Sequence, residues 1–120
     1  MPAMLLAALL SMAGPTAGYA DAKAKADAYE AALAPRDLNT LIDAQQQALE
    51  AALKTCGAWS PGRLPFTIVI AVRADGGVSR SWRNADDPYI DCTVRTVTSH
   101  TYPVATGKAF HASFELNFGD

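Results

Sequence analysis

The chain has 120 residues, 50% of them hydrophobic and 18% charged, with a formal net charge of −2 at pH 7. This length is enough for one domain, and the low charge content argues against a disordered polyelectrolyte. There is neither the clustered basic face of a nucleic-acid-binding protein nor an apolar run of about 18 residues. We therefore expect no nucleic-acid partner and no membrane span in the mature chain.

Residues 1–20 have the order of a secretory signal peptide. Ala3–Leu10 is apolar without interruption, and small residues, Gly18 and Ala20, stand three and one positions before Asp21. An apolar core followed by a small-x-small site is what signal peptidase recognises. No Lys or Arg precedes the apolar run, and a buried N-terminal helix is the alternative interpretation.

We predict that the chain consists of three parts, of which this segment, residues 1–20, is the first. We predict cleavage after Ala20, with Ala17 and Ala22 as alternative sites, then a helical lead-in at residues 21–36 and a folded domain at residues 37–120. No cysteine stands at the cleavage site, so a lipid anchor is not expected there. The predicted localisation is periplasmic or secreted.

The lead-in favours a weak helix. Alanines alternate with charged residues over Asp21–Ala34, so the helix propensity is high but the apolar face is thin. We expect a solvated or frayed helix that contacts the rest of the domain through Tyr29 and Leu33 and ends at Pro35.

The strongest helical pattern follows Pro35. Asp37 is the expected N-cap, and Gly57 is the expected C-terminal stop. Between them, mostly apolar residues recur at spacings of three and four, which indicates one buried helix face. The stripe consists of Leu38, Leu41, Ile42, Gln45, Leu49, Ala52, Leu53 and Cys56.

A β-hairpin is predicted after a loop at Ala58–Pro65, in which Trp59 is expected to cover the edge of the core. Phe66–Val72 is the clearest strand, and Val78–Arg83 returns as the second strand. Asp75-Gly76-Gly77 between them is typical of a tight turn, because glycine adopts a positive φ freely.

The segment Tyr89–Ser99 fits a strand and a helix equally well on local grounds. Its β-branched residues favour a strand, whereas Asp87 as N-cap and Pro88 at the first helical position favour a helix. We expect a helix, because a second helix can help to cover the sheet. The final strand, Phe110–Phe118, alternates apolar and polar residues, so one face should be buried and the other wet.

These elements predict an α+β domain, a three-stranded antiparallel sheet covered on one face by two helices, with an extra N-terminal helix. Cys56 and Cys92 then lie on neighbouring helices. An isolated pair without CxxC spacing indicates a structural disulfide in an oxidising compartment, whereas His100 and His111 are too few and too scattered for a zinc site. Closing a loop of about 35 residues stabilises a chain by roughly 3–4 kcal/mol. No metal or cofactor is expected.

Three short motifs follow one another in the folded domain. They are Ile68-x-Ile70-x-Val72-x-x-x-Gly76-x-Val78, then Asp91-Cys92-Thr93-x-x-x-Val97, then Tyr102-Pro103 before the last strand. This order resembles the TonB carboxy-terminal domain superfamily, closest to the AgmX/PglI-type C-terminal relatives, over about Leu38 to Phe118.

The resemblance implies a two-helix, three-strand domain in which Cys56 and Cys92 pair and Tyr102-Pro103 takes the place of a Phe-Pro. It also implies an interaction role in the cell envelope, since such domains resemble adaptors that accept a peptide strand at a sheet edge. The chain has no membrane anchor beyond the predicted signal and no proline-rich spacer. Energy transduction is therefore not expected.

Candidate catalytic groups are few. His111, Ser113 and Glu115 alternate on one face of the last strand. Side chains two apart on a strand lie about 6.5–7 Å from each other, too far for a hydrogen-bonded triad. Asp86 and Asp87 fit a turn and an N-cap better than a metal site. We predict that the protein is not an enzyme.

A candidate partner-binding patch lies on the hairpin. Arg73, Arg80 and Arg83 accompany Trp82, and Arg and Trp are enriched at protein interfaces. Val78, Arg80 and Trp82 are expected on one side of their strand. The alternative is structural, with arginine stems covering a sheet face over Trp82.

We therefore expect a non-enzymatic protein-interaction module that binds an envelope protein or peptide by strand-edge addition. The alternatives are a small ligand-binding envelope domain and a small envelope enzyme or enzyme inhibitor. A buried apolar cavity would favour the first, and a concave site around His100 or His111 the second. Neither the partner's identity nor the oligomeric state follows from the sequence.

Overall fold

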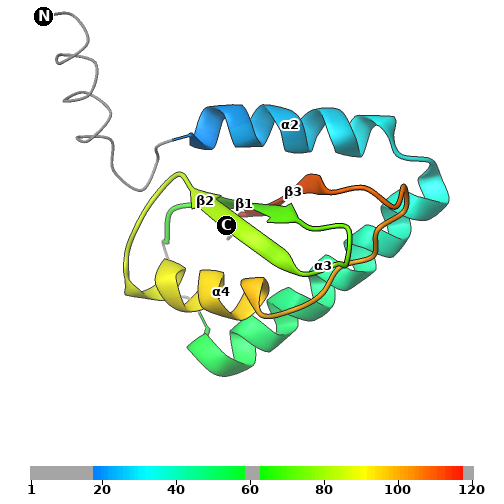
Figure 1. Cartoon of the computed structure of the whole chain (residues 1–120). Helices are drawn as coiled ribbons and strands as arrows, with labels where there is room; N and C mark the ends of the chain where they lie inside the picture. The colour runs from blue at the N-terminus through cyan, green and yellow to red at the C-terminus, as the bar shows by residue number, and fades with distance from the viewer. Residues whose placement is uncertain (1–17, 59–62, 118–120) are drawn as a thin grey trace, which may run out of the picture.

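A computed structural model describes residues 18–58 and 63–117, which form three layers (Figure 1). Helix α2 (Tyr19–Ala32) lies on one face of a β-sheet, and helices α3 (Pro35–Cys56) and α4 (Pro88–Thr98) lie on the other. The predicted α+β class is confirmed. Most of the predicted signal peptide, and Trp59, lie outside the described residues.

Three antiparallel strands form the sheet in the order β2-β1-β3: β1 (Phe66–Val72), β2 (Val78–Arg83) and β3 (Phe110–Leu116). The predicted hairpin is confirmed, and so is the last strand up to Leu116. Phe118, which was expected to continue it, lies outside the described residues. Because β1 is central, the outer sides of β2 and β3 are the two edges of the sheet.

The main core lies between the sheet and helices α3 and α4. A disulfide joins Cys56 at the end of α3 to Cys92 in α4, as predicted, with 5.8 Å between the Cα atoms. Tyr102, which precedes β3, donates its hydroxyl hydrogen to the carbonyl oxygen of Val97 at 2.5 Å. The buried residues of this core are Leu41, Ala48, Phe66, Ile68, Ile70, Val72, Ile90, Val94, Val97, Tyr102, Phe110, Ala112 and Phe114.

Helix α2 covers the second face of the sheet, so the expectation of a solvated helix is wrong. Ala22 and Ala26 are 2% and 0% exposed and pack against the central strand. Their small side chains let the helix lie close to the sheet, and this close packing buries surface that a thin apolar face does not suggest. Ser113 of β3, on the face expected to be wet, is 8% exposed. Tyr29 and Leu33 do pack against the main core, as predicted, and Tyr29 stacks on Phe110 with ring centroids 4.4 Å apart.

Helix α3 differs from its prediction in two details. It begins at Pro35, which has no N–H to leave unpaired in the first turn, so Asp37 lies inside the helix and is not the N-cap. Within the stripe, Ile42 and Leu53 are 39% and 40% exposed, whereas Ala48, which was not in the stripe, is 0% exposed. Small residues therefore supply part of the contact between α3 and the core.

A β-bulge decides which way the side chains of β2 point. Trp82 pairs with Val69, but after a break in register Val78 pairs with Val72. Directly paired residues point to the same face, so Arg80 and Trp82 face α2 while Val78 faces the main core. The prediction that these three residues share one side is wrong, because the extra residue of the bulge reverses the alternation.

The segment that fitted a strand and a helix equally well is helix α4. Asp87 is its N-cap and accepts a hydrogen bond from the Ile90 N–H at 2.8 Å, as predicted. Ile90, Val94 and Val97 then face the core along one side of the helix. Burial of this side outweighs the local β propensity of the segment.

Candidate functional site

The hydrogen bonds between β1 and β2 show which residues of β2 direct their main-chain N–H and C=O groups away from β1. Thr67 turns its N–H and its C=O toward β2, where Asn84 accepts and donates hydrogen bonds at 2.9 and 3.3 Å. The N–H and C=O groups of successive residues point to opposite sides of a strand, so those of Val69, two residues after Thr67, also point toward β2. Val69 therefore exchanges main-chain hydrogen bonds with its partner Trp82. The neighbouring residue of β2, Ser81, therefore directs its N–H and C=O outward.

The outer edge of β2 is open. Arg83, two residues beyond Ser81, also directs its main-chain groups outward, and within residues 18–58 and 63–117 no main-chain or side-chain partner satisfies either residue's outward pair. A hollow of about 290 Å³ lies beside this edge. It is lined by Val78, Ser79, Arg80, Ser81 and, from α4, Thr98.

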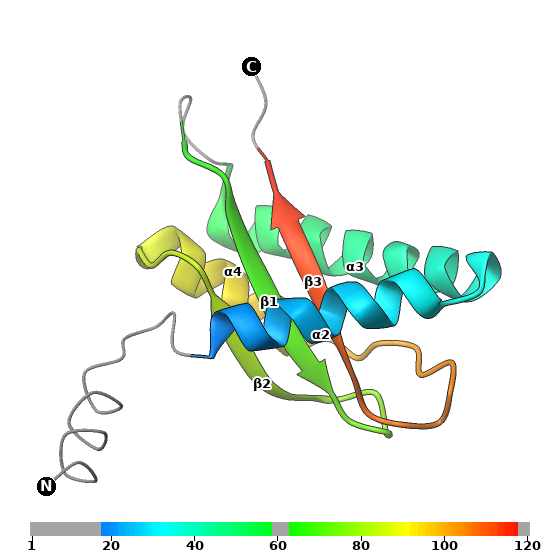
Figure 2. The ribbon, with the colours of Figure 1, turned by 90° about the horizontal axis from the view of Figure 1, so that it is seen from above.

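The outer edge of β3 is closed at its centre. The Ser113 N–H donates to Oε1 of Glu30 in α2 at 3.2 Å, and the Ser113 carbonyl oxygen accepts from Nε2 of Gln45 in α3 at 2.8 Å. One acceptor and one donor thus take the positions that a neighbouring strand would supply. Figure 2 shows α2 crossing the sheet over β1 and β3, so this edge lies between two helices.

A groove of about 510 Å³ runs along the β3 edge between α2 and α3. Partial burial raises the pKa of the Glu30 carboxyl, and the hydrogen bond from the Ser113 N–H opposes that rise. The nearby carboxylates of Asp27 and Glu115 also raise this pKa, while Lys23 lowers it. The groove is lined by Asp27, Glu30, Ala31, Leu38, Ile42, Gln45, Ser113 and Glu115.

Two of the four predicted partner-binding residues lie together. The guanidinium of Arg80 lies 5.0 Å from the centre of the Trp82 ring, on the α2 face of β2. Trp82 in turn stacks on His111 of β3, with ring centroids 5.4 Å apart. Arg80 is exposed, while Trp82 is half-buried under α2.

The other two arginines of the predicted patch lie elsewhere. Arg83 forms ion pairs with Asp86, at 3.2 Å, and with Asp91 of α4. Arg73 stands at the hairpin turn and pairs with Asp75 at 3.1 Å. The structure therefore places Arg73 and Arg83 in local ion pairs.

The side chains that cap β3 were not predicted as site residues. Gln45 does carry a signal, because it is the polar member of an otherwise mostly apolar helix stripe, and a buried polar side chain needs a hydrogen-bond partner. Glu30 carries no such signal, since it stands among the charged residues of an alanine-rich helix. Its role depends on α2 crossing β3.

The three residues weighed as a catalytic set contact different partners. His111 stacks on Trp82, and its partial burial lowers the pKa of the imidazole. The Ser113 hydroxyl is buried and has no hydrogen-bond partner among the described residues. Glu115 approaches Lys23 at 3.4 Å. Among the described residues, no three His, Cys, Asp or Glu side chains gather as a metal site would require.

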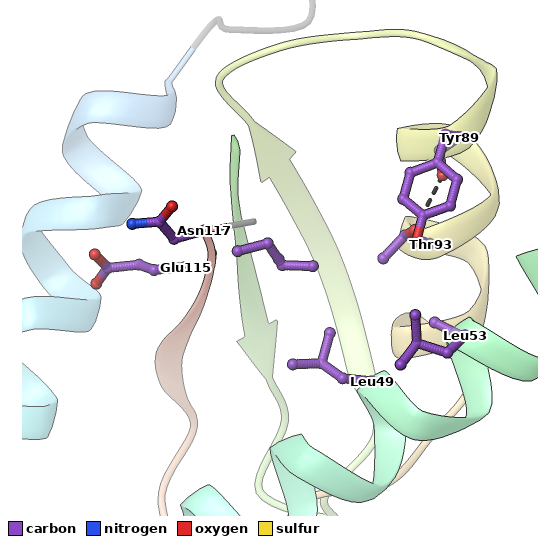
Figure 3. A pocket seen from close by; sticks show the side chains of 8 residues that line it. Leu49, Leu53, Tyr89, Thr93, Glu115 and Asn117 are labelled. Carbon is purple, nitrogen blue, oxygen red and sulfur yellow. Dashed lines mark hydrogen bonds between the residues drawn. The ribbon is translucent and has the colours of Figure 1, made fainter. Parts of the chain in front are cut away.

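A second hollow, mainly apolar, lies at the end of the main core (Figure 3). Leu49 and Leu53 from α3 and Tyr89 and Thr93 from α4 surround it, and the last residues of β3 border it. Its volume is about 260 Å³, below the roughly 300–1,000 Å³ of most small-molecule sites. Its lining residues are Leu49, Ala52, Leu53, Tyr89, Thr93, Glu115, Leu116 and Asn117.

The chain matches no protein-family model, no curated protein and no solved structure. None of the described helices has the length and apolar character needed to cross a membrane.

Proposed function

We propose that this protein is a non-enzymatic interaction module of the cell envelope that binds an extended segment of another protein as a fourth strand on the outer edge of β2. The difference between the two edges of the sheet carries this proposal. The outward peptide groups of Ser81 and Arg83 are free in the described part of the chain, whereas those of Ser113 are satisfied by Glu30 and Gln45. Main-chain hydrogen bonds to a free edge are the basis of binding by strand addition.

The order of elements supports the same proposal. Helix α3, strands β1 and β2, helix α4 and strand β3 follow one another as the resemblance to TonB carboxy-terminal domains implies. That resemblance covers about Leu38 to Phe118 and suggests an adaptor of the envelope. Helix α2 lies outside this range and closes the β3 side of the sheet.

A periplasmic or secreted location forms part of the proposal. The disulfide between Cys56 and Cys92 supports it, since structural disulfides persist in oxidising compartments. Mass spectrometry of the exported protein tests it. We expect an oxidised cysteine pair and a new N-terminus at Asp21, with cleavage after Ala17 or Ala22 as the alternatives. An uncleaved chain with two free thiols would contradict the proposed location.

A proline substitution tests strand addition. The Ser81 N–H points away from β1, so Ser81→Pro removes an outward donor without removing a hydrogen bond of the sheet. Ser81→Ala is the matched control, because it keeps the N–H. In pull-downs from the native envelope, we expect wild type and Ser81→Ala to retain a partner that Ser81→Pro loses. Equal recovery by all three proteins, each with a native circular dichroism spectrum, would exclude the β2 edge.

A second candidate function is the binding of a small apolar ligand in the hollow of Figure 3. The apolar lining of the hollow favours this function, and Leu53, which is 40% exposed, offers an apolar surface to a ligand there. A fragment screen by NMR tests it, with shifts expected at the amides of Leu53, Tyr89 and Leu116. Fragments that shift other parts of the protein, or none, would remove this candidate.

A further inference from the structure

Two exposed arginines stand beside the open edge without an acidic partner among the described residues. Arg80 projects from the α2 face of β2, and its guanidinium contacts the Trp82 ring. Arg95 is exposed on α4, which packs against β2 on the other face of the sheet. Neither side chain forms an ion pair with any described residue, in contrast to Arg73 and Arg83.

The position of Arg95 follows from its neighbours on α4. Asp91, one turn earlier, binds Arg83 of β2, and Thr98, nearly one turn later, lines the hollow beside β2. Residues three and four apart share one face of a helix, so Arg95 lies on the face that borders the β2 edge. Along the direction of β2, this places Arg95 at a level between those of Arg83 and Val78.

Three acidic residues near this edge are already paired. Asp86 and Asp91 bind Arg83, and Asp75 binds Arg73. Four arginines, Arg73, Arg80, Arg83 and Arg95, thus stand against three carboxylates, which leaves the β2 edge with one excess positive charge, although the whole chain has a formal net charge of −2. An incoming strand would supply the missing anionic partners.

Strand geometry sets where those partners must stand in an incoming segment. Successive side chains of a strand point to opposite faces, so a residue opposite Arg80 faces the α2 side and the next residue, opposite Ser81, faces Arg95. The third residue lies opposite the half-buried Trp82. Opposite charges and aromatic–aliphatic contacts stabilise such cross-strand pairs.

We propose that the β2 edge selects a protein segment in which two consecutive acidic residues adjoin an apolar residue, aligned with Arg80, Ser81 and Trp82. Arg80 and Arg95 bind the two carboxylates from the two faces of the sheet, and Trp82 contacts the apolar side chain. This inference rests on the proposed function, and it adds the chemistry of the partner to the mode of binding.

Synthetic peptides test this selectivity on the full chain, with its disulfide formed. Peptides of about ten residues, built on a Thr/Val background, carry the central triplet Glu-Asp-Val, its reverse Val-Asp-Glu, or the amide counterparts Gln-Asn-Val and Val-Asn-Gln. Fluorescence anisotropy measures affinity, and NMR follows the amides of Ser81 and Arg83. We expect the better acidic peptide to bind roughly tenfold more tightly than its amide counterpart, with a preference that falls at high ionic strength.

Three variants separate charge selection from strand addition. Arg80→Ala/Arg95→Ala should bind the acidic and amide peptides equally, while Arg36→Ala/Lys54→Ala, which removes two exposed charges of α3, should keep the preference. Ser81→Pro should lose every peptide. The proline variant then reports on the mode of binding, and the arginine variant reports on selectivity.

Each other outcome overturns a defined part of the proposal. Equal binding of acidic and amide peptides by wild type would overturn the selectivity and leave strand addition standing. An acidic preference that survives in Ser81→Pro would leave a basic surface patch and overturn strand addition. No binding of any peptide would overturn both. A dimer that Ser81→Pro converts to a monomer in analytical ultracentrifugation would identify a second copy of the chain as the occupant and overturn the peptide proposal.

Discussion

The two edges of the sheet solve the same problem in different ways. An edge strand exposes unpaired peptide groups that invite another strand, and proteins protect such edges by covering them or by placing charges on them. At β3 the structure uses cover, because Glu30 and Gln45 occupy the peptide groups of Ser113. At β2 it uses a bulge and exposed charge, with Arg80 in no ion pair among the described residues. Cover prevents any strand from pairing with the peptide groups of Ser113, whereas positive charge excludes only segments that do not match it.

The largest expected effect comes from removing the link that supports both edges. The disulfide joins α3, which supplies Gln45 to the β3 edge, to α4, which borders the β2 edge. Cys56→Ser/Cys92→Ser should lower the free energy of unfolding by roughly 3–4 kcal/mol in urea titrations. Wild type treated with a reductant is the matched control and should lose as much. A loss below about 1 kcal/mol in both would show that tertiary packing alone holds the helices.

The second largest effect is expected from a substitution that loosens α2 from the sheet and so exposes the β3 edge. Ala26 is 0% exposed between α2 and the sheet, so Ala26→Glu buries a carboxylate and should destabilise the contact by about 2–4 kcal/mol. Hydrogen exchange at the Ser113 amide should then accelerate far more than at the amides that link β1 to β2. Ala24→Glu, at an exposed position of the same helix, is the control. Equal acceleration throughout the sheet would mean that α2 does not protect β3 specifically.

A smaller effect comes from removing one cap. Gln45→Ala leaves the Ser113 carbonyl oxygen without its donor and should cost about 1 kcal/mol of unfolding free energy. Gln46→Ala, at an exposed neighbouring position, should cost much less. Equal losses of unfolding free energy by the two variants in urea titrations would show that the hydrogen bond from Gln45 to Ser113 does not stabilise the fold.

The smallest effect concerns the second cap and depends on pH. Partial burial is the main reason that the pKa of Glu30 lies above its ordinary value of 4.5. Such a carboxyl stabilises the fold fully below its unfolded pKa and loses that contribution as pH rises through its folded pKa. Glu30→Gln keeps an acceptor oxygen and removes the charge, so its Tm at pH 7 should exceed that of wild type by on the order of 1–2 °C.

The control for the second cap is Glu50→Gln, at an exposed position of α3. The gain from Glu30→Gln should shrink as the pH falls toward 4 and the Glu30 carboxyl takes up a proton in wild type. Differential scanning calorimetry across this range measures both variants. A gain that is the same at every pH would show that burial of the Glu30 charge is not its cause.

Apart from Tyr89–Ser99, which fitted a strand and a helix equally well, the local pattern of residues was sufficient to predict the elements but not which of their faces are buried. The spacing of apolar residues predicted both β-strands of the hairpin, the strand that begins at Phe110 and the helix that ends at Cys56. The predicted faces of β2 failed at a single bulged residue, which no periodicity reveals because it interrupts the period itself. The predicted solvation of α2 failed for a related reason, since alanine contributes little to an apolar face yet packs closely against a sheet.

The candidate site was predicted only in part. Arg80 and Trp82 do lie together, and their residue types and their position on the predicted hairpin singled them out. Arg73 and Arg83 do not join them, because they form ion pairs with aspartates close to them in the sequence. Arg73 pairs with Asp75, and Arg83 pairs with Asp86 and Asp91. Arg95 joins the proposed site because α4 packs against β2.

The sequence by itself determined every described helix and strand except α4, together with the α+β class and the pairing of the only two cysteines, because each depends on the order and spacing of residues along the chain. Helix α4 was decided by burial against the core. Only the tertiary structure decided which edge of the sheet is open. Glu30 and Gln45 are 83 and 68 positions away from Ser113 in the chain, and they cap it because α2 and α3 pass on either side of β3. Strand patterns show which side chains are buried, but the outward main-chain groups of a strand carry no residue-specific signal. Their partners are therefore set by packing alone.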